Sequence, residues 1–293
     1  MKNKIIYFLF LLPFAAAAQD DLMKELEQNE KKSTELIGQT FYGTRLVNGQ
    51  TVETRGNGEL EFIFAHRFGA INSGAYNLFG LDEAYVRLGL EYAITNRLGV
   101  GFGRNSSDKT MDGYLRYKLL AQSRGAKNMP VTVTAFANAA IRTSPKKEDA
   151  TFDITTEDRL SYTTQVLIAR KFNSVLSLQL MPSYVHKNTV DRTIENNENF
   201  LLGIGGRLKV SRSISLTTEY YHRLNPVAND PYHNSLGFGI DIETGGHVFQ
   251  LVMTNSRGLT ERAFLTETTG DFFDGDIHLG FNVTRTFQVK KRK

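Results

Sequence analysis

One stretch decides the fold: Asp276-Ile277-His278-Leu279-Gly280-Phe281-Asn282-Val283-Thr284-Arg285-Thr286-Phe287-Gln288-Val289. Its odd-numbered positions are apolar apart from Arg285, and its even-numbered positions are polar or glycine. Successive side chains of a β-strand point to opposite faces, so this stretch predicts a strand with one apolar and one polar face.

The same alternation recurs upstream, with connections that are alternately short and long. It predicts strands near residues 59–68, 83–94, 97–105, 110–121, 130–142, 158–171, 175–187, 199–210, 213–224, 234–244, 247–256 and 276–289. Antiparallel strands joined by tight turns at one end and longer loops at the other are typical of outer-membrane barrels. We therefore predict an all-β fold, a transmembrane antiparallel up-and-down β-barrel of about 12 strands, or about 14 if the preceding segment adds two.

The N-terminus has the composition of a signal peptide. Lys2 and Lys4 precede an apolar run over residues 5–14, and four alanines follow at positions 15–18. We expect cleavage near Ala18 and export to the outer membrane of a Gram-negative cell. An uncleaved anchor is disfavoured because the apolar run is too short to span a membrane comfortably. The absence of cysteine suits a route through an oxidising compartment.

The predicted organisation has four parts: a signal peptide at 1–18, a polar N-terminal segment at 19–57, the barrel at 58–289 and a basic tail at 290–293. Within the polar segment, residues 40–55 are expected to form a hairpin with a type I′ turn at Asn48-Gly49. This hairpin would plug the lumen, cap the periplasmic mouth or add strands to the wall.

The polar faces of the strands are expected to line the lumen. The charged side chains predicted there are Arg87, Glu91, Arg116, Lys118, Arg207, Lys209, Glu219, Asp241 and Glu243. Because both signs are present, the sequence predicts no selectivity for anions or cations. Gly99, Gly101 and Gly103 form a bare stripe on the same face, which we expect long side chains of the neighbouring strands to cover.

The connection at 257–275 mixes apolar and charged residues. It is expected to fold inward and constrict the lumen, to close over the barrel as a lid, or to pack on neighbouring loops. The candidates for a constriction are Glu261, Arg262, Phe264 and Glu267.

Other functional classes find little support in the sequence. No serine lies two residues from the outward histidines His66, His186 or His222, so a catalytic pair of nucleophile and base is not predicted. The remaining histidines lack the spacing of metal ligands, and no cofactor is expected. The net charge of +4 reflects in part the basic tail, so nucleic acid is not an expected partner.

Several segments resemble a family of uncharacterised Gram-negative outer-membrane β-barrels, over roughly residues 40–287. They are Asn255-Ser256-Arg257-Gly258-Leu259-Thr260-Glu261, Phe264-Leu265-Thr266-Glu267-Thr268, residues 275–285, His66-Arg67-Phe68-Gly69, Asn72-Ser73-Gly74 and Asp112-Gly113-Tyr114-Leu115. The resemblance implies a fold and a membrane location but assigns no residue a role. The chain departs from many barrels by continuing beyond Phe287 into the basic tail.

The sequence therefore predicts a passive channel, or a transport-related porin, for small polar solutes, with outer-membrane lipid as its surroundings. The alternative is a closed barrel that anchors, binds or stiffens through its extracellular loops, 143–157 and 257–275. Neither the solute, the oligomeric state, the openness of the lumen nor the role of residues 19–57 follows from the sequence.

Overall fold

The computed structural model describes residues 33–144 and 155–290, and its main feature is a closed antiparallel barrel of twelve strands. In chain order these are β2 (Glu59–Ala70), β3 (Ala84–Ala93), β4 (Leu98–Asn105), β5 (Met111–Leu120), β7 (Thr132–Ile141), β8 (Leu160–Lys171), β9 (Leu176–Lys187), β10 (Glu198–Lys209), β11 (Ile214–Arg223), β12 (Ser235–Thr244), β13 (His247–Thr254) and β14 (His278–Gln288). Each pairs with its neighbours along the chain, and β14 pairs with β2 to close the wall. The predicted fold class is confirmed, with twelve wall strands rather than fourteen.

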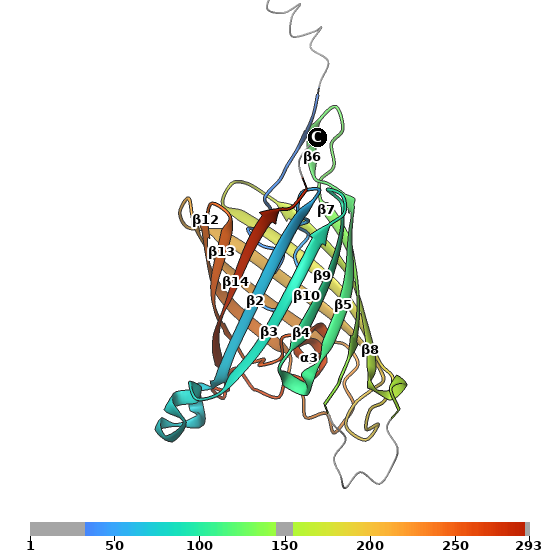
Figure 1. The fold of residues 1–293 in the computed structure, drawn as a ribbon, viewed down its shortest axis with the longest axis vertical. Coiled ribbons are helices and arrows are strands. Elements are labelled where there is room, and N and C mark those ends of the chain that lie inside the picture. The colour runs from blue at the N-terminus through green and yellow to red at the C-terminus, as the bar shows by residue number, and fades with distance from the viewer. Residues whose placement is uncertain (1–32, 145–154, 291–293) are drawn as a thin grey trace, which may run out of the picture.

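The two ends of the barrel differ as the turn lengths predict. Tight turns and the C-terminal end of β14 lie at one end, which we call the turn end (Figure 1, top). The long connections lie at the other, which we call the loop end. The predicted signal peptide, the rest of residues 1–32 and residues 291–293 of the tail lie outside the described residues, as do residues 145–154 of a predicted partner loop.

The alternation of apolar and polar residues follows the wall. On β10, Phe200, Leu202, Ile204 and Leu208 point outward and are 46–50 % exposed, whereas Arg207 between them points inward and is 2 % exposed. Apolar side chains on the outside of a closed sheet form the band that a barrel presents to lipid. The polar groups are thereby turned toward the lumen.

Shorter elements of secondary structure lie at both ends of the barrel. At the turn end, β1 (Thr34–Leu36) pairs with β6 (Ser123–Gly125) in a small sheet that projects beyond the wall (Figure 1). The connections carry the 3₁₀ helices η1 (Ile71–Ser73), η2 (Ala75–Gly80), η3 (Ser107–Lys109) and η4 (Glu157–Arg159) and the α-helix α3 (Glu261–Thr266).

Candidate functional site

Residues 40–53, which we call the plug segment, lie inside the barrel. Every residue from Thr40 to Val52 is buried, although the segment carries no regular strand. Its two arms meet at the isolated bridge between Arg45 and Gln50. Since the lumen wall surrounds it, this segment occupies the space through which a solute would pass.

The plug segment turns back at Asn48-Gly49, but not through the predicted type I′ turn. That turn needs positive φ at both central residues, and neither Asn48 nor Gly49 has it, so the prediction is wrong. Glycine is needed here for another reason. A Cβ at Gly49 would lie 3.0 Å from Tyr221 Cζ and 3.1 Å from Glu219 Oε2, so only glycine allows the tip to approach the wall this closely.

Glu219 on β11 holds the tip of the plug segment. Its buried carboxylate accepts hydrogen bonds from the backbone N–H groups of Val47 (3.1 Å), Asn48 (2.7 Å) and Gly49 (3.0 Å). Hydrogen bonds to a charged acceptor are stronger than neutral ones, and burial removes the competition from water. Glu219, which the sequence predicts to line the lumen, therefore binds the tip of the plug segment.

Arg67 on β2 binds the acceptor groups of the same tip. Its guanidinium donates to the carbonyl oxygen of Val47 (3.2 Å) and to Asn48 Oδ1 (2.9 Å). Asn282 on β14 also donates to the Val47 carbonyl, at 2.9 Å. Together with Glu219, these side chains pair both donors and acceptors of the tip.

The arm of the plug segment that follows the tip is fixed by amide and hydroxyl groups of the wall. Gln179 on β9 accepts from the Val52 N–H at 2.9 Å and donates to the Gln50 carbonyl at 2.8 Å. Thr134 on β7 donates to the Val52 carbonyl at 2.9 Å. Arg116 on β5 donates to the carbonyl of Glu53 at 2.6 Å and to the side chain of Gln50.

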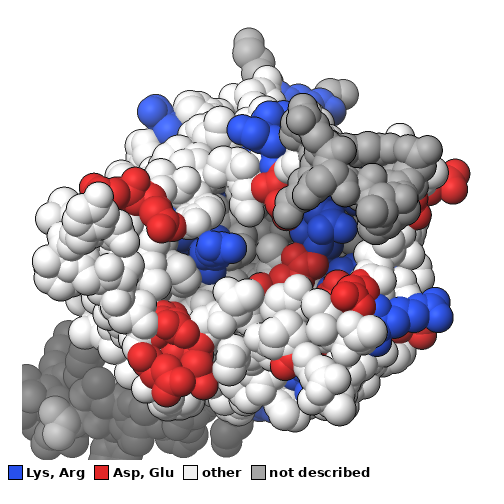
Figure 2. All heavy atoms as spheres, turned by 90° about the horizontal axis from the view of Figure 1, so that it is seen from below, with Lys and Arg blue, Asp and Glu red and all other residues white. Residues whose placement is uncertain are grey.

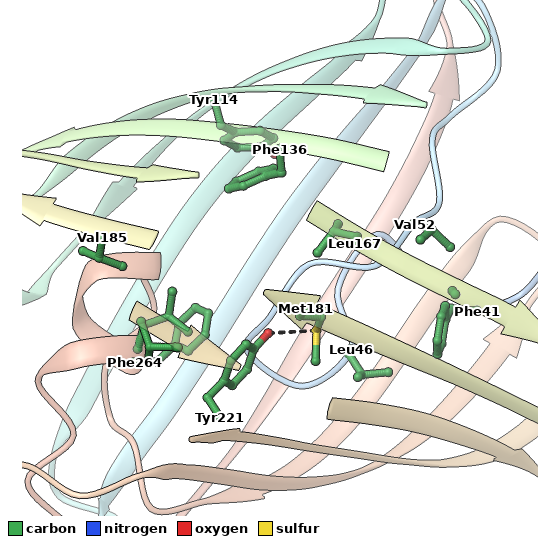
Figure 3. Close-up of a cluster of buried hydrophobic side chains, with 13 residues drawn as sticks. Phe41, Leu46, Val52, Tyr114, Phe136, Leu167, Met181, Val185, Tyr221 and Phe264 are labelled. Atoms are coloured by element: carbon green, nitrogen blue, oxygen red, sulfur yellow. Dashed lines mark hydrogen bonds between the residues drawn. The ribbon is translucent and has the colours of Figure 1, made fainter. Parts of the chain in front are cut away.

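A second element enters the lumen from the loop end. The buried Glu261 of α3 forms an ion pair of 2.7 Å with Arg45 of the plug segment and accepts from Gln50 Nε2 at 2.5 Å. Phe264 of the same helix is fully buried and packs against the Tyr221 ring, with centroids 5.5 Å apart (Figure 3). The loop 257–275 thus folds inward and touches the plug segment.

The glycine stripe is covered by the side chains of its neighbours, as predicted. Arg116 and Glu91 form an ion pair of 3.1 Å over Gly99, and the Tyr114 ring lies over Gly101. Farther along, Arg87 forms an ion pair of 2.5 Å with Asp112 over Gly103. These pairs are buried, so each charge is compensated within the wall.

The remaining predicted charges lie toward the turn end of the barrel. Asp241 on β12 is buried and accepts from Thr217 (3.2 Å) and Gln250 (2.9 Å), whereas Lys118, Lys209 and Glu243 are half-buried. All of them belong to the half of the wall near the turn end. The structure therefore does not bring the predicted lumen charges together in one cluster.

At the loop end, the predicted constriction residues join a network of ions. Arg262 pairs with Glu267 and, at 3.3 Å, with Asp108, and Lys187 lies 3.5 Å from Glu267. Lys187 Nζ lies over the Tyr232 ring, 5.9 Å from its centre. Burial, and after it the nearby acidic groups Glu195 and Glu267, raise the pKa of Tyr232 to about 12. Viewed from this end, the barrel is hollowed, with basic and acidic groups side by side in the hollow (Figure 2).

Part of the inner wall is apolar, which the sequence reasoning missed. Leu167 on β8 and Met181 on β9 point inward and pack with Leu46 in a buried apolar cluster (Figure 3). Leu201 on β10 belongs to the same cluster and is 2 % exposed. The sequence does contain a signal for this packing, because these apolar residues stand on otherwise polar strand faces. An apolar side chain on the lumen side is stable only if another apolar group covers it. Arg67, Gln179 and Asn282 were missed as well, although their inward positions follow from the alternation.

Within residues 33–144 and 155–290, no helix is long and apolar enough to cross a membrane. No group of three or more His, Asp or Glu side chains in the described ranges is arranged to hold a metal ion.

Comparison with known proteins gives one family and several similar folds. Residues 41–287 match the family described as Membrane bound beta barrel domain (DUF5777). No curated protein matches the sequence. Similar solved structures include the KdgM porin in complex with disordered oligogalacturonate, with 8% identity, a TM-score of 0.48 and coverage of 78% of this chain and 99% of that chain. An outer-membrane channel from Pseudomonas putida F1 has 14% identity and a TM-score of 0.45, with 80% of this chain and 98% of that chain covered.

Proposed function

The chain belongs to the DUF5777 family of membrane-bound β-barrel domains, and we propose that it is an outer-membrane channel for small polar solutes that conducts when the plug segment leaves the lumen. Lipid surrounds the apolar band, and the solute passes along the polar inner faces of the strands. In the described conformation the plug segment and α3 occupy that path.

The charged inner wall is the observation that carries the proposal. Arg87, Asp112, Glu91 and Arg116 are at most 2 % exposed, although they lie in a lumen. Replacing a buried ion pair by apolar side chains of similar volume is often neutral or stabilises a protein by about 1–4 kcal/mol. A wall that never met water would therefore gain little from these charges, whereas a wall that is periodically hydrated needs polar groups.

The way in which the plug segment is held also supports a removable plug. Its contacts with the wall are hydrogen bonds from side chains and one apolar face, and within the described residues no strand ladder joins it to the wall. Each net hydrogen bond contributes only about 0.5–1.5 kcal/mol, because water replaces the partner on release. The segment can therefore leave without disturbing the twelve-stranded wall.

The apolar part of the lumen favours the second candidate, a closed barrel that acts through its loops. Phe41, Leu46 and Val52 of the plug segment are at most 2 % exposed. Burial of such a side chain stabilises the seated plug segment by about 1.5–3 kcal/mol, and this stabilisation would be lost when the segment is released. A permanently seated plug would make the protein an anchoring or binding barrel.

A reversible tether distinguishes the two candidates. A Cβ at Gly237 on β12 would lie 3.3 Å from Val47 Cβ, close to the separation of about 3.5–4.5 Å found in disulfides. The chain has no cysteine, so the double variant Val47→Cys/Gly237→Cys would carry one pair that links the plug tip to the wall.

We expect single-channel recordings in planar bilayers to show conductance for the reduced double variant and none for the oxidised one. Each single variant is the matched control, and oxidation should leave its conductance unchanged. Equal conductance of the oxidised and reduced double variants would show that the path does not require release of the plug segment. Silence of the folded wild type and of the reduced variant would favour the closed barrel.

A further inference from the structure

A row of polar side chains crosses the inner wall near the turn end. Lys171 on β8 is in register with Ser177 on β9, and Ser177 is in register with Arg207 on β10. One step nearer the end, Lys209 on β10 is in register with Ser215 on β11. Directly opposed residues on antiparallel strands have Cβ atoms about 4.5–5.5 Å apart, so these side chains are neighbours in the lumen.

Four polar atoms in this row lack a hydrogen-bond partner among the described residues. They are Nε and Nη1 of Arg207 and the Oγ atoms of Ser177 and Ser215. The exposed fractions are 2 % for Arg207 and 0 % for both serines. Buried polar groups are almost always paired, and an unpaired buried cation is especially costly. The donor groups of this row therefore lack a hydrogen-bond acceptor among the described residues.

The nearby carboxylates do not supply that acceptor. Asp241 is engaged by Thr217 and Gln250, and Glu53 accepts the backbone N–H groups of Thr40 (2.7 Å) and Phe41 (3.2 Å). Glu243 is half-buried, and it forms no ion pair with Arg207 within the described part of the chain. The guanidinium instead lies 4.9 Å from the centre of the Tyr42 ring, and its buried Nε and Nη1 have no acceptor among the described residues.

Two ammonium groups complete the surroundings of the row. Lys209 Nζ lies 5.9 Å from the centre of the same Tyr42 ring. Lys171 Nζ donates to the carbonyl oxygen of Gly38 at 3.0 Å and keeps further donors free for a ligand. Side chains of four strands (β8, β9, β10 and β11) and the plug residue Tyr42 therefore form one positively charged cluster.

We propose that this row binds a small phosphate-type oxyanion. The guanidinium N–H groups suit an oxyanion, and the two hydroxyls and two ammonium groups offer more donors than the two oxygens of a carboxylate would use. Because these side chains point into the lumen, the ligand is a soluble phosphate or phosphate ester and not a lipid headgroup. The bound oxyanion would lie beside Tyr42, where the plug segment begins. The proposal goes beyond channel function and does not depend on it.

Isothermal titration calorimetry on the folded, full-length mature chain in detergent tests the site at constant ionic strength. The probes are inorganic phosphate, glycerol 3-phosphate and acetate. We expect both phosphates to bind and acetate to bind at least about tenfold more weakly. Tighter binding of glycerol 3-phosphate than of inorganic phosphate would identify an ester as the ligand, and the reverse would identify the free ion.

Arg207→Gln should weaken phosphate binding at least about tenfold, because it removes charge-assisted hydrogen bonds. The matched control is Arg170→Gln, which changes an exposed outward arginine at the same end and should leave binding unchanged. If Arg207→Gln does not fold, Ser177→Ala keeps every charge and should weaken binding about threefold to tenfold by removing one donor.

Three results would overturn the proposal: no binding of phosphate to the folded wild type, equal losses in the Arg170 and Arg207 variants, or acetate binding as tight as phosphate. Binding heats are measured without conduction. A failure here therefore leaves the channel proposal standing, and a silent channel leaves this site standing.

Discussion

Replacing Glu219 by glutamine should release the tip of the plug segment. The change keeps the shape of the side chain but turns one carboxylate oxygen into an NH₂ group. In the structure, Oε1 accepts from the Asn48 N–H at 2.7 Å, and Oε2 accepts from Val47 at 3.1 Å and Gly49 at 3.0 Å. Whichever way the amide is oriented, at least one backbone donor faces another donor.

The expected size of the effect follows from these contacts. A buried donor left without a partner costs about 1–3 kcal/mol. The amide is cheaper to bury than the carboxylate, which offsets part of this cost. Arg67 lies within electrostatic range of Glu219, however, and would lose a compensating charge. We therefore expect the released population to rise about 5-fold to 150-fold, which corresponds to about 1–3 kcal/mol.

Thiol labelling measures that population. Val47 is 1 % exposed, so in the variant Val47→Cys a water-soluble reagent reaches the thiol only after the tip leaves the wall. When opening and closing are fast relative to labelling, the labelling rate follows the open population. Adding Glu219→Gln should raise the rate by the factor given above, while the circular dichroism of the barrel stays unchanged.

The matched control is Glu243→Gln, which removes a half-buried lumen carboxylate that makes no hydrogen bond to the plug segment within the described residues. Labelling of Val47→Cys should not change in that background. If Glu219→Gln labels no faster than Glu243→Gln, the carboxylate does not hold the tip and the reasoning is wrong.

Three further predictions concern the tip, the wall and the lipid face. Gly49→Ala should raise the labelling rate at least as much as Glu219→Gln, because its Cβ would collide with Tyr221, and a rate equal to that of the unmodified tip would contradict this. Arg87→Gln leaves Asp112 buried without its ion-pair partner and should lower the free energy of unfolding in urea by about 3–5 kcal/mol; a loss below about 1 kcal/mol would show that water reaches the pair. Leu202→Arg on the outward face should lower the free energy of unfolding by about 2–4 kcal/mol when the same assay is done in lipid vesicles. The control Leu202→Met should lower it by less than about 1.5 kcal/mol. Equal losses would place this position outside the membrane.

The barrel could be predicted from the sequence because its pattern is local. Whether Leu202 or Gly203 faces lipid depends only on the alternation within one strand and on the difference between lipid and water. The lengths of the turns then fix which ends of the strands lie together, and the predicted strand limits agree with the structure to within two residues. No contact between distant residues has to be known.

The interior could not be predicted in the same way, because its contacts join distant parts of the chain. Glu219 is 172 positions from Val47, and Arg45 is 216 positions from Glu261. The alternation places Glu219 in the lumen but does not say what occupies the lumen. Only the inward apolar residues, such as Met181, indicate from the sequence that part of the inner wall is packed against something.

The two elements that occupy the lumen are connected to each other, and this has a consequence for how the barrel responds. The plug segment extends from the turn end and α3 from the loop end, and Glu261 joins them through Arg45 and Gln50. Withdrawal of the plug segment leaves Glu261 without these partners, so it destabilises the inward position of α3. Because coupling between binding equilibria is reciprocal, an event that draws the loop 257–275 outward must loosen the plug segment by the same free energy. The ion pair between Glu261 and Arg45 therefore couples the position of the plug segment at the turn end to the position of the loop 257–275 at the loop end.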